Sequence, residues 1–252
     1  MIIIPGLLSI ICLVVALYFW FLVSKPAIQI LTAAEIQNVI SEDADHYYDK
    51  FHKKDFKVRD VDDKPGYLFK IAKSGCAPEG GNGLKVEECI ATVHAHLSER
   101  RNETIHGIDM NSFLNLPWKI GFTRDNNYEN GLPHTRGDVI ILNNEDIAKR
   151  THQEVCRLLI HEKSHVYQKK RDMSLYMKEK YTEVKRKDYT DESVPANPDT
   201  NDTIYRCNET NEILGGTYAE TPTHFRDVVF TLDDHTMEHP FESIAYKMEK
   251  LI

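Results

Sequence analysis

The chain of 252 residues is long enough for one substantial domain or two small ones. Its composition is ordinary for a globular protein, with 41% hydrophobic and 28% charged residues, so a collagen-like or low-complexity chain is excluded. The formal net charge is -8 and no basic block dominates, which argues against nucleic acid as a partner.

The first 23 residues form an apolar run, because no Asp, Glu, Lys or Arg precedes Lys25. About 20 apolar residues suffice to cross a bilayer as a helix. A cleaved signal peptide is the alternative, but signal peptides usually have a basic start, a shorter apolar stretch and a small-x-small cleavage site. The run has none of these features. We therefore predict a transmembrane anchor over residues 1–24 and a single domain over residues 25–252.

The side of the membrane is indicated only weakly. Three N-x-T sequons, at Asn102, Asn201 and Asn208, permit glycosylation of a lumenal or external domain. Cys76 and Cys89 bracket a glycine-rich loop and are candidates for a disulfide in an oxidising compartment. We expect a single-pass membrane protein whose main domain is lumenal or external.

The first half of this domain mixes helix and strand signals. Thr32 is a candidate cap for a helix, and Cys156, further on, falls in a helical pattern and is predicted to be a core thiol. The predicted elements are a helix over 32–51, a strand over 67–72, a glycine-rich loop over 74–83 and a helix over 85–100. Residues 113–122 favour no single element, and residues 124–137 are polar and turn-rich.

The second half continues with a buried strand over 138–142 and a helix that ends near Lys170. Thr151 and Glu154 match a capping box at the start of that helix. The later predicted elements are a loop over 188–202, short strands over 204–207, 213–218 and 228–232, and an amphipathic helix over 239–251 with Pro240 in its first turn. Together these elements indicate an α+β fold.

The helix after the capping box contains the sequence His161-Glu162-Lys-Ser-His165. Histidines four residues apart lie on the same face, so both can bind one metal ion, and Glu162 is placed to act on a water rather than to ligate. The bland interpretation is two ordinary helix histidines beside a glutamate. Apolar flanks, among them Leu159 and Val166, turn this helix inward, where imidazoles need a metal or a hydrogen-bond partner. We therefore predict a metal site.

A catalytic zinc ion needs a third protein ligand. Glu242 is the preferred candidate, because its apolar neighbours turn it toward a facing helix and Ala245 permits close approach. Asp172 lies about 10 Å further along the helix than His165 and could ligate only if the helix broke. Three histidines further along the chain are also candidates for the third ligand, namely His224, His235 and His239.

The segment LLIHEKSHVYQK, followed downstream by EHPFESIAY, resembles the zincin metallopeptidases of the gluzincin kind. In that group the third ligand is a glutamate on a later helix, often in an E-x-x-A setting. With the NPDT segment from Asn197, the pattern also resembles uncharacterised metallopeptidases of large DNA viruses. The resemblance spans about Asp138 to Met248. The interval from His165 to Glu242 is longer than in many gluzincins and leaves room for inserted strands.

The resemblance implies a zincin-like metallopeptidase domain over residues 25–252, in which a small mixed sheet packs on the helix of the motif. It implies Zn²⁺ as cofactor, held by His161, His165 and Glu242, and a peptide or protein substrate. Glu162 would act as general base and then as general acid. The membrane would be that of a host or a virion. A strand edge would align the substrate, with residues 138–142 as that edge or its inner neighbour. The oxyanion donor is open among Tyr246, His239 and His224.

Two other functions stay open. The chain could be a catalytically inactive zincin-fold membrane or virion protein with a structural or interaction role, although such a protein has no need of Glu162. It could also be an adhesion protein that uses Arg136-Gly137-Asp138, provided that this loop is exposed and Asp138 is free.

Overall fold

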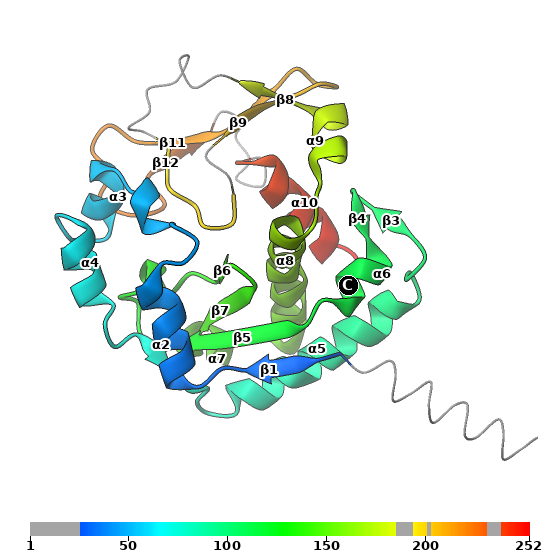
Figure 1. The fold of residues 1–252 in the computed structure, drawn as a ribbon, viewed down its shortest axis with the longest axis horizontal. Helices are drawn as coiled ribbons and strands as arrows, with labels where there is room; N and C mark the ends of the chain where they lie inside the picture. The colour runs from blue at the N-terminus through cyan, green and yellow to red at the C-terminus, as the bar shows by residue number, and fades with distance from the viewer. Residues whose placement is uncertain (1–25, 185–193, 201–202, 231–237) are drawn as a thin grey trace, which may run out of the picture.

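The computed structural model describes residues 26–184, 194–200, 203–230 and 238–252. They form a mixed α+β fold of helices and small sheets (Figure 1). The transmembrane anchor predicted for residues 1–24 lies outside this part of the chain. Among the helices that are described, none combines the length and the apolar character needed to cross a membrane.

The main sheet has five strands in a mixed arrangement. They are β1 (Ile28–Ile30), β2 (Gly75–Cys76), β5 (Trp118–Thr123), β6 (His134–Arg136) and β7 (Val139–Asn143). β1, β5 and β7 run parallel, while β6 pairs antiparallel with β7 at one edge. β7 confirms the buried strand predicted for 138–142, and it is the inner neighbour of β6. β6 was not predicted, because its polar sequence gives no strand signal and lies in the stretch 124–137, which was expected to be turn-rich.

The helices are α2 (Ala33–Glu42), α3 (Lys53–Val58), α4 (Lys64–Lys70), α5 (Asn82–Ser98), α6 (Met110–Asn115), α7 (Asn144–Lys149), α8 (His152–Lys170), α9 (Ser174–Lys180) and α10 (Pro240–Glu249), with short 3-10 turns η1 (Tyr48–Lys50) and η2 (Glu129–Gly131). α8 occupies the middle of the molecule, where it packs against α5, α10 and the main sheet (Figure 1).

Local rules explain where α8 begins. Thr151 Oγ1 accepts a hydrogen bond from Glu154 N at 3.3 Å, and the Glu154 carboxylate accepts one from Thr151 N at 2.7 Å. These bonds form the predicted capping box. The helix ends at Lys170, as expected from the sequence.

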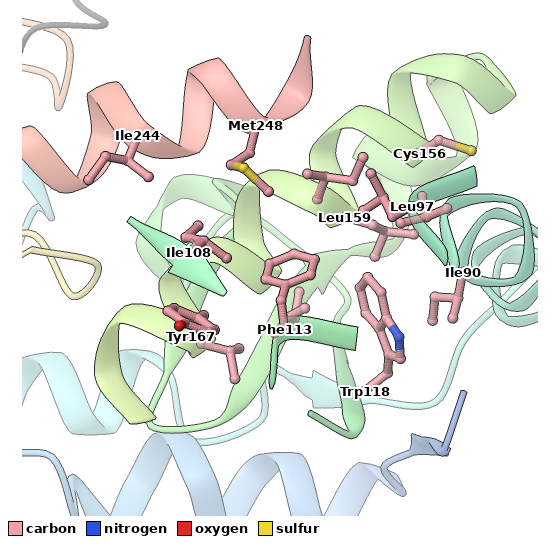
Figure 2. Close-up of a cluster of buried hydrophobic side chains, with 14 of the residues drawn as sticks. Ile90, Leu97, Ile108, Phe113, Trp118, Cys156, Leu159, Tyr167, Ile244 and Met248 are labelled. Atoms are coloured by element: carbon pink, nitrogen blue, oxygen red, sulfur yellow. The ribbon is translucent and has the colours of Figure 1, made fainter. Parts of the chain in front are cut away.

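The larger hydrophobic core joins α5, α6, α8, α10 and the main sheet (Figure 2). Its fully buried side chains include Ile90, Leu97, Phe113, Trp118, Leu159, Ile244 and Met248. Each buried aliphatic or aromatic side chain of this size contributes about 1.5–3 kcal/mol. The core therefore holds α10 firmly against α8.

Smaller sheets fill the long interval between α8 and α10. Their strands are β8 (Tyr181–Val184), β9 (Ile204–Cys207), β10 (Ile213–Leu214), β11 (Gly216–Tyr218) and β12 (Val228–Phe230), and a further pair earlier in the chain is β3 (Thr104–Ile105) with β4 (Ile108–Asp109). β9 confirms the strand predicted for 204–207. The strand predicted for 213–218 is divided at Gly215 into β10 and β11, which belong to different sheets.

In the first half, one predicted element is of the wrong type, and one predicted helix begins where expected, after its Thr32 cap, but is too long. The segment expected to be a strand over 67–72 is the helix α4, because Asp63 caps its first turn by accepting a hydrogen bond from Gly66 N at 2.8 Å. Tyr67 and Ile71, one turn apart, are both fully buried by this helix. The helix predicted for 32–51 ends at Glu42, since the next residue has a left-handed backbone.

Cys76 and Cys89, the candidates for a disulfide, are not bonded to each other. Both residues are buried free thiols, one on β2 and the other on α5. Cys156 is a buried core thiol on α8, as predicted.

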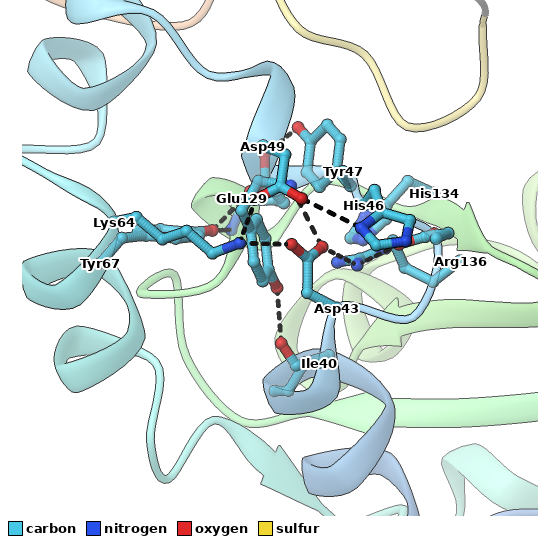
Figure 3. Close-up of polar contacts among 12 residues, drawn as sticks. Ile40, Asp43, His46, Tyr47, Asp49, Lys64, Tyr67, Glu129, His134 and Arg136 are labelled. Carbon is cyan, nitrogen blue, oxygen red and sulfur yellow. Dashed lines mark hydrogen bonds and ion pairs between the residues drawn. The ribbon is translucent and has the colours of Figure 1, made fainter.

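A second group of buried side chains, beside α2, α3 and α4, is polar (Figure 3). The Arg59 guanidinium forms an ion pair with Glu129 at 2.5 Å, and the hydroxyls of Tyr47 and Tyr67 also donate to the Glu129 carboxylate. Arg136 forms ion pairs with Asp43 at 2.9 Å and with Asp45.

These contacts overturn the adhesion hypothesis. Arg136 is only 3% exposed. Asp138 lies 3.1 Å from Lys119 Nζ and 3.2 Å from Lys170 Nζ, so its carboxylate is paired with two cations. An Arg-Gly-Asp loop with a buried arginine and a neutralised aspartate cannot present both charges to a receptor.

Candidate metal centre

α8 and α10 bring together the three residues predicted to hold a metal ion. Glu242 Oε2 lies 3.2 Å from His161 Nε2 and 3.6 Å from His165 Nε2. Ligand atoms bound to one zinc ion at about 2.0–2.1 Å are separated from one another by roughly 3.3 Å. The three side chains therefore have the spacing that a single small cation requires.

The local sequence of α10 explains why Glu242 faces α8. The His239 imidazole caps the helix by accepting a hydrogen bond from Phe241 N at 3.1 Å, and Pro240 begins its first turn. Ile244 and Ala245 are fully buried, and the small alanine side chain lets the two helices approach closely. Glu242 is thereby fixed between the helices.

The outer nitrogen of each histidine is held by an oxygen acceptor. His161 Nδ1 lies 2.6 Å from Glu249 Oε1, and His165 Nδ1 lies 2.8 Å from Gln168 Oε1. Because these oxygens only accept, each Nδ1 must carry a proton, and Nε2 is the atom left for an ion. His165 Nε2 is buried and has no hydrogen-bond partner among the described residues. A metal ion would satisfy it.

Glu162 lies on α8 beside the ligand group and is almost completely buried. Its Oε2 accepts a hydrogen bond from Thr135 Oγ1 of β6 at 3.0 Å. Burial raises the pKa of the Glu162 carboxyl to about 7, and the negative charge of Asp199 acts in the same direction. The sheet edge thus orients the residue predicted to act as general base.

Acidic side chains outnumber cations around the two histidines. Burial would raise the pKa of Glu242, but the charge of His165 and a hydrogen bond from His161 hold it well below the ordinary value. Burial and the nearby charge of Glu242 raise the pKa of Glu238 to about 7. Together with Glu249, these carboxylates make a negative potential that favours a divalent cation.

The segment from Asn197 borders the site. Asn197 Nδ2 donates to Glu242 Oε1 at 3.2 Å. Asp199 Oδ1 accepts from Thr135 N at 2.8 Å and lies 3.1 Å from Lys169 Nζ, which itself donates to Thr135 O at 2.5 Å. The outward backbone groups of β6 at Thr135 are therefore already paired.

Of the other candidate ligands, the structure describes three, and it does not place them in this group. Asp172 is exposed and accepts a hydrogen bond from Ser174 N at 2.8 Å. His224 Nε2 lies 2.9 Å from Asn130 Nδ2 on an exposed loop. His239 is buried as the cap of α10, and His235 lies outside the described residues.

Tyr246, one candidate for the oxyanion donor, packs its ring against His161 with centroids 4.7 Å apart. The sequence reasoning missed other residues of the site, namely Thr135, Gln168 and Glu249. Gln168 follows His165 by three positions, and Glu249 follows Glu242 by two turns, so helical spacing could have found both. No local pattern in the sequence indicates that Thr135 belongs to the site.

Comparison with protein-family models, with curated proteins and with solved structures finds no match to this chain.

Proposed function

We propose that this chain is a zinc-dependent metallopeptidase of zincin-like fold, with His161, His165 and Glu242 as ligands. The observation that carries the proposal is the convergence of two Nε2 atoms and one carboxylate oxygen from α8 and α10. The mixed sheet beside α8, with an antiparallel edge strand nearest the motif, also supports it. The chemistry of the donor set, two imidazoles and a carboxylate, suits Zn²⁺.

A bound zinc ion would supply a Lewis acid that polarises the scissile carbonyl and lowers the pKa of an attacking water. Glu162 would take the proton of that water and pass it to the leaving amine. Thr135 holds the Glu162 carboxylate by its hydroxyl, so the acceptor is oriented before the substrate arrives. Tyr246, beside His161, is our candidate for the donor to the developing oxyanion.

In the same proposal, β6 is the strand edge that aligns an extended peptide. The N–H and C=O of Thr135 are engaged by Asp199 and Lys169. A substrate that pairs with β6 at this position must therefore displace the segment from Asn197 to Thr200. This occupied edge favours a second candidate function, a metal-binding protein of the same fold that has no peptidase activity.

Metal content and cleavage of a mixed peptide library by the purified full chain distinguish the two functions. We expect one zinc ion to be lost in His161→Ala and Glu242→Ala and kept in Glu162→Gln. Cleavage should fall by about 10²–10⁴-fold in Glu162→Gln. Glu87→Gln, which changes an exposed glutamate on α5, is the matched control.

Each contrary outcome is informative. Zinc retention without any cleavage by the wild type would favour the non-enzymatic candidate. Absence of zinc from the folded wild type, or cleavage that survives Glu162→Gln, would overturn the metallopeptidase proposal. The anchor over residues 1–24 and the lumenal or external location stay proposals, which a glycosylation shift at Asn102 or Asn208 on eukaryotic expression would support.

A further inference from the structure

A second group of metal-ligating side chains lies between α5 and the first turns of α8. Cys89 Sγ is 3.3 Å from His152 Nδ1, and the ligand atoms of Cys89, His152 and Cys156 all lie within 4.8 Å of one another. The two cysteines are buried, while His152 is exposed to solvent. Figure 2 shows Cys156 on α8 at the edge of the hydrophobic core.

The spacing on α8 separates this group from the histidine pair. His152 and Cys156 are four residues apart, like His161 and His165, so each pair lies on one face of the helix. Nine residues, or two and a half turns, separate corresponding members of the two pairs. His152 and Cys156 thus lie on the side of α8 opposite to His161 and His165, roughly 13 Å away along the helix axis. They face α5 rather than α10.

Contacts between α5 and the start of α8 hold the three side chains together, and Cys156 Sγ donates to Cys89 O at 3.9 Å. Although the His152 side chain is exposed, its ring turns back to the buried sulfur, with Nδ1 at 3.3 Å and Nε2 at 3.8 Å from Cys89 Sγ. Cys89 Sγ also donates to His152 O at 3.3 Å. The capping box at Thr151 fixes the backbone here, so the imidazole is held beside both thiols.

We propose that Cys89, His152 and Cys156 form a second metal site, which takes a thiophilic ion of the Zn²⁺ type and links α5 to α8. Two thiolates and one imidazole are the donors that select such an ion, at about 2.3 Å for sulfur and about 2.0–2.1 Å for nitrogen. Ligand atoms around one such ion lie roughly 3.3–3.8 Å apart, so the cluster needs only a small contraction. Each thiol releases its proton to solvent when it binds, and solvent at the exposed His152 completes the coordination.

A catalytic cysteine–histidine pair is the obvious rival. Cys89 is 0% exposed, so no substrate can reach its sulfur. The group therefore fits ion binding better than covalent chemistry.

Cobalt titration of the reduced, metal-free full chain tests the second site independently of any peptidase activity. Co²⁺ bound by thiolates shows an intense sulfur-to-metal charge-transfer absorption, whereas a site of two histidines and a glutamate has no sulfur. We expect two equivalents of Co²⁺ to bind and one of them to give this absorption. Zn²⁺ should displace both.

The variants assign each equivalent to its site. Cys89→Ser and Cys156→Ser should abolish the charge-transfer absorption and retain one equivalent, while His161→Ala should do the reverse. Cys76→Ser changes a buried thiol outside the group and should retain both equivalents. Because a buried serine can unfold the chain, His152→Ala serves as the second test, and this exposed change should weaken the thiolate site at least tenfold.

The proposal is overturned if the reduced wild type shows no thiolate absorption, or if the absorption survives Cys89→Ser. A disulfide between Cys89 and Cys156 in protein purified without oxidant, shown by thiol counting, would also overturn it. Loss of the histidine site alone would contradict the proposed peptidase and leave this second site supported.

Discussion

Two clusters of buried charged side chains lie on either side of the main sheet, and they differ in how completely their polar atoms are paired. The Arg59 guanidinium pairs with two buried carboxylates, Glu129 at 2.5 Å and Asp55 at 3.5 Å, and tyrosine hydroxyls complete the hydrogen bonds. At His161, His165 and Glu242, further carboxylates crowd the imidazoles and one buried nitrogen lacks a hydrogen-bond partner among the described residues. A fully paired cluster is destabilised when one partner is removed, whereas an acidic cluster with an unpaired nitrogen is suited to a cation.

The largest effect should come from breaking the Arg59 cluster. Glu129→Gln removes the nearer counterion of the buried Arg59 guanidinium and leaves only Asp55, at 3.5 Å. Breaking a buried ion pair typically costs about 3–5 kcal/mol of unfolding free energy. Denaturant unfolding of the metal-free protein measures this loss. Glu103→Gln, which breaks the exposed pair with Arg100, should cost no more than about 1 kcal/mol. Equal losses in the two variants would show that the Arg59 cluster is not structurally special.

Glu242→Gln should act chiefly on metal binding. It removes a proposed ligand, so the Kd for Zn²⁺ should rise by more than about 100-fold. This exceeds the weakening that is typical when a hydrogen-bond partner of a ligand is lost. Calorimetric titration with Zn²⁺ in a competing chelator measures the affinity. A Kd within threefold of the wild type would remove Glu242 from the ligand set.

Glu249→Gln should have a smaller effect on the same affinity. The Glu249 carboxylate holds His161 Nδ1 at 2.6 Å and so fixes the direction of Nε2. Loss of such an outer carboxylate typically weakens metal binding by about 10–100-fold. Glu179→Gln, an exposed change on α9, provides the control for this titration. Unchanged affinity in Glu249→Gln would show that packing alone orients His161.

Lowering the pH should reduce the free energy of unfolding through the Arg59 cluster, by a smaller amount than the substitution does. Burial would raise the pKa of Glu129, but the charge of Arg59 and its hydrogen bonds hold it below the ordinary value. This stabilisation is complete above the unfolded pKa of about 4.3 and is lost as pH falls through the lower folded pKa. The slope of the unfolding free energy against pH that this one group contributes should not exceed about 1.4 kcal/mol per pH unit. Unfolding measured from pH 6 down to about pH 3 should show a slope that is shallower in Glu129→Gln.

Local signals predicted the elements that carry the candidate site. The capping box at Thr151 and the four-residue spacing of the histidines act within one or two helical turns, so they are readable in the sequence. The start of α10 at Pro240 and the inward orientation of Glu242 follow from equally local patterns. Where local signals compete, they mislead: the segment at Tyr67 has strand-like residues, but the Asp63 cap makes it a helix.

The sequence by itself therefore determined the motif helix, its two histidines and the helix of the third ligand. Only the tertiary structure decided that β6 holds Glu162, that Asp199 and Lys169 occupy the edge of β6, and that Cys89 meets His152 and Cys156. These contacts join residues that are tens of positions apart in the chain. Spacing along the chain fixes the face of one helix, but the packing of the hydrophobic core decides which other element that face meets.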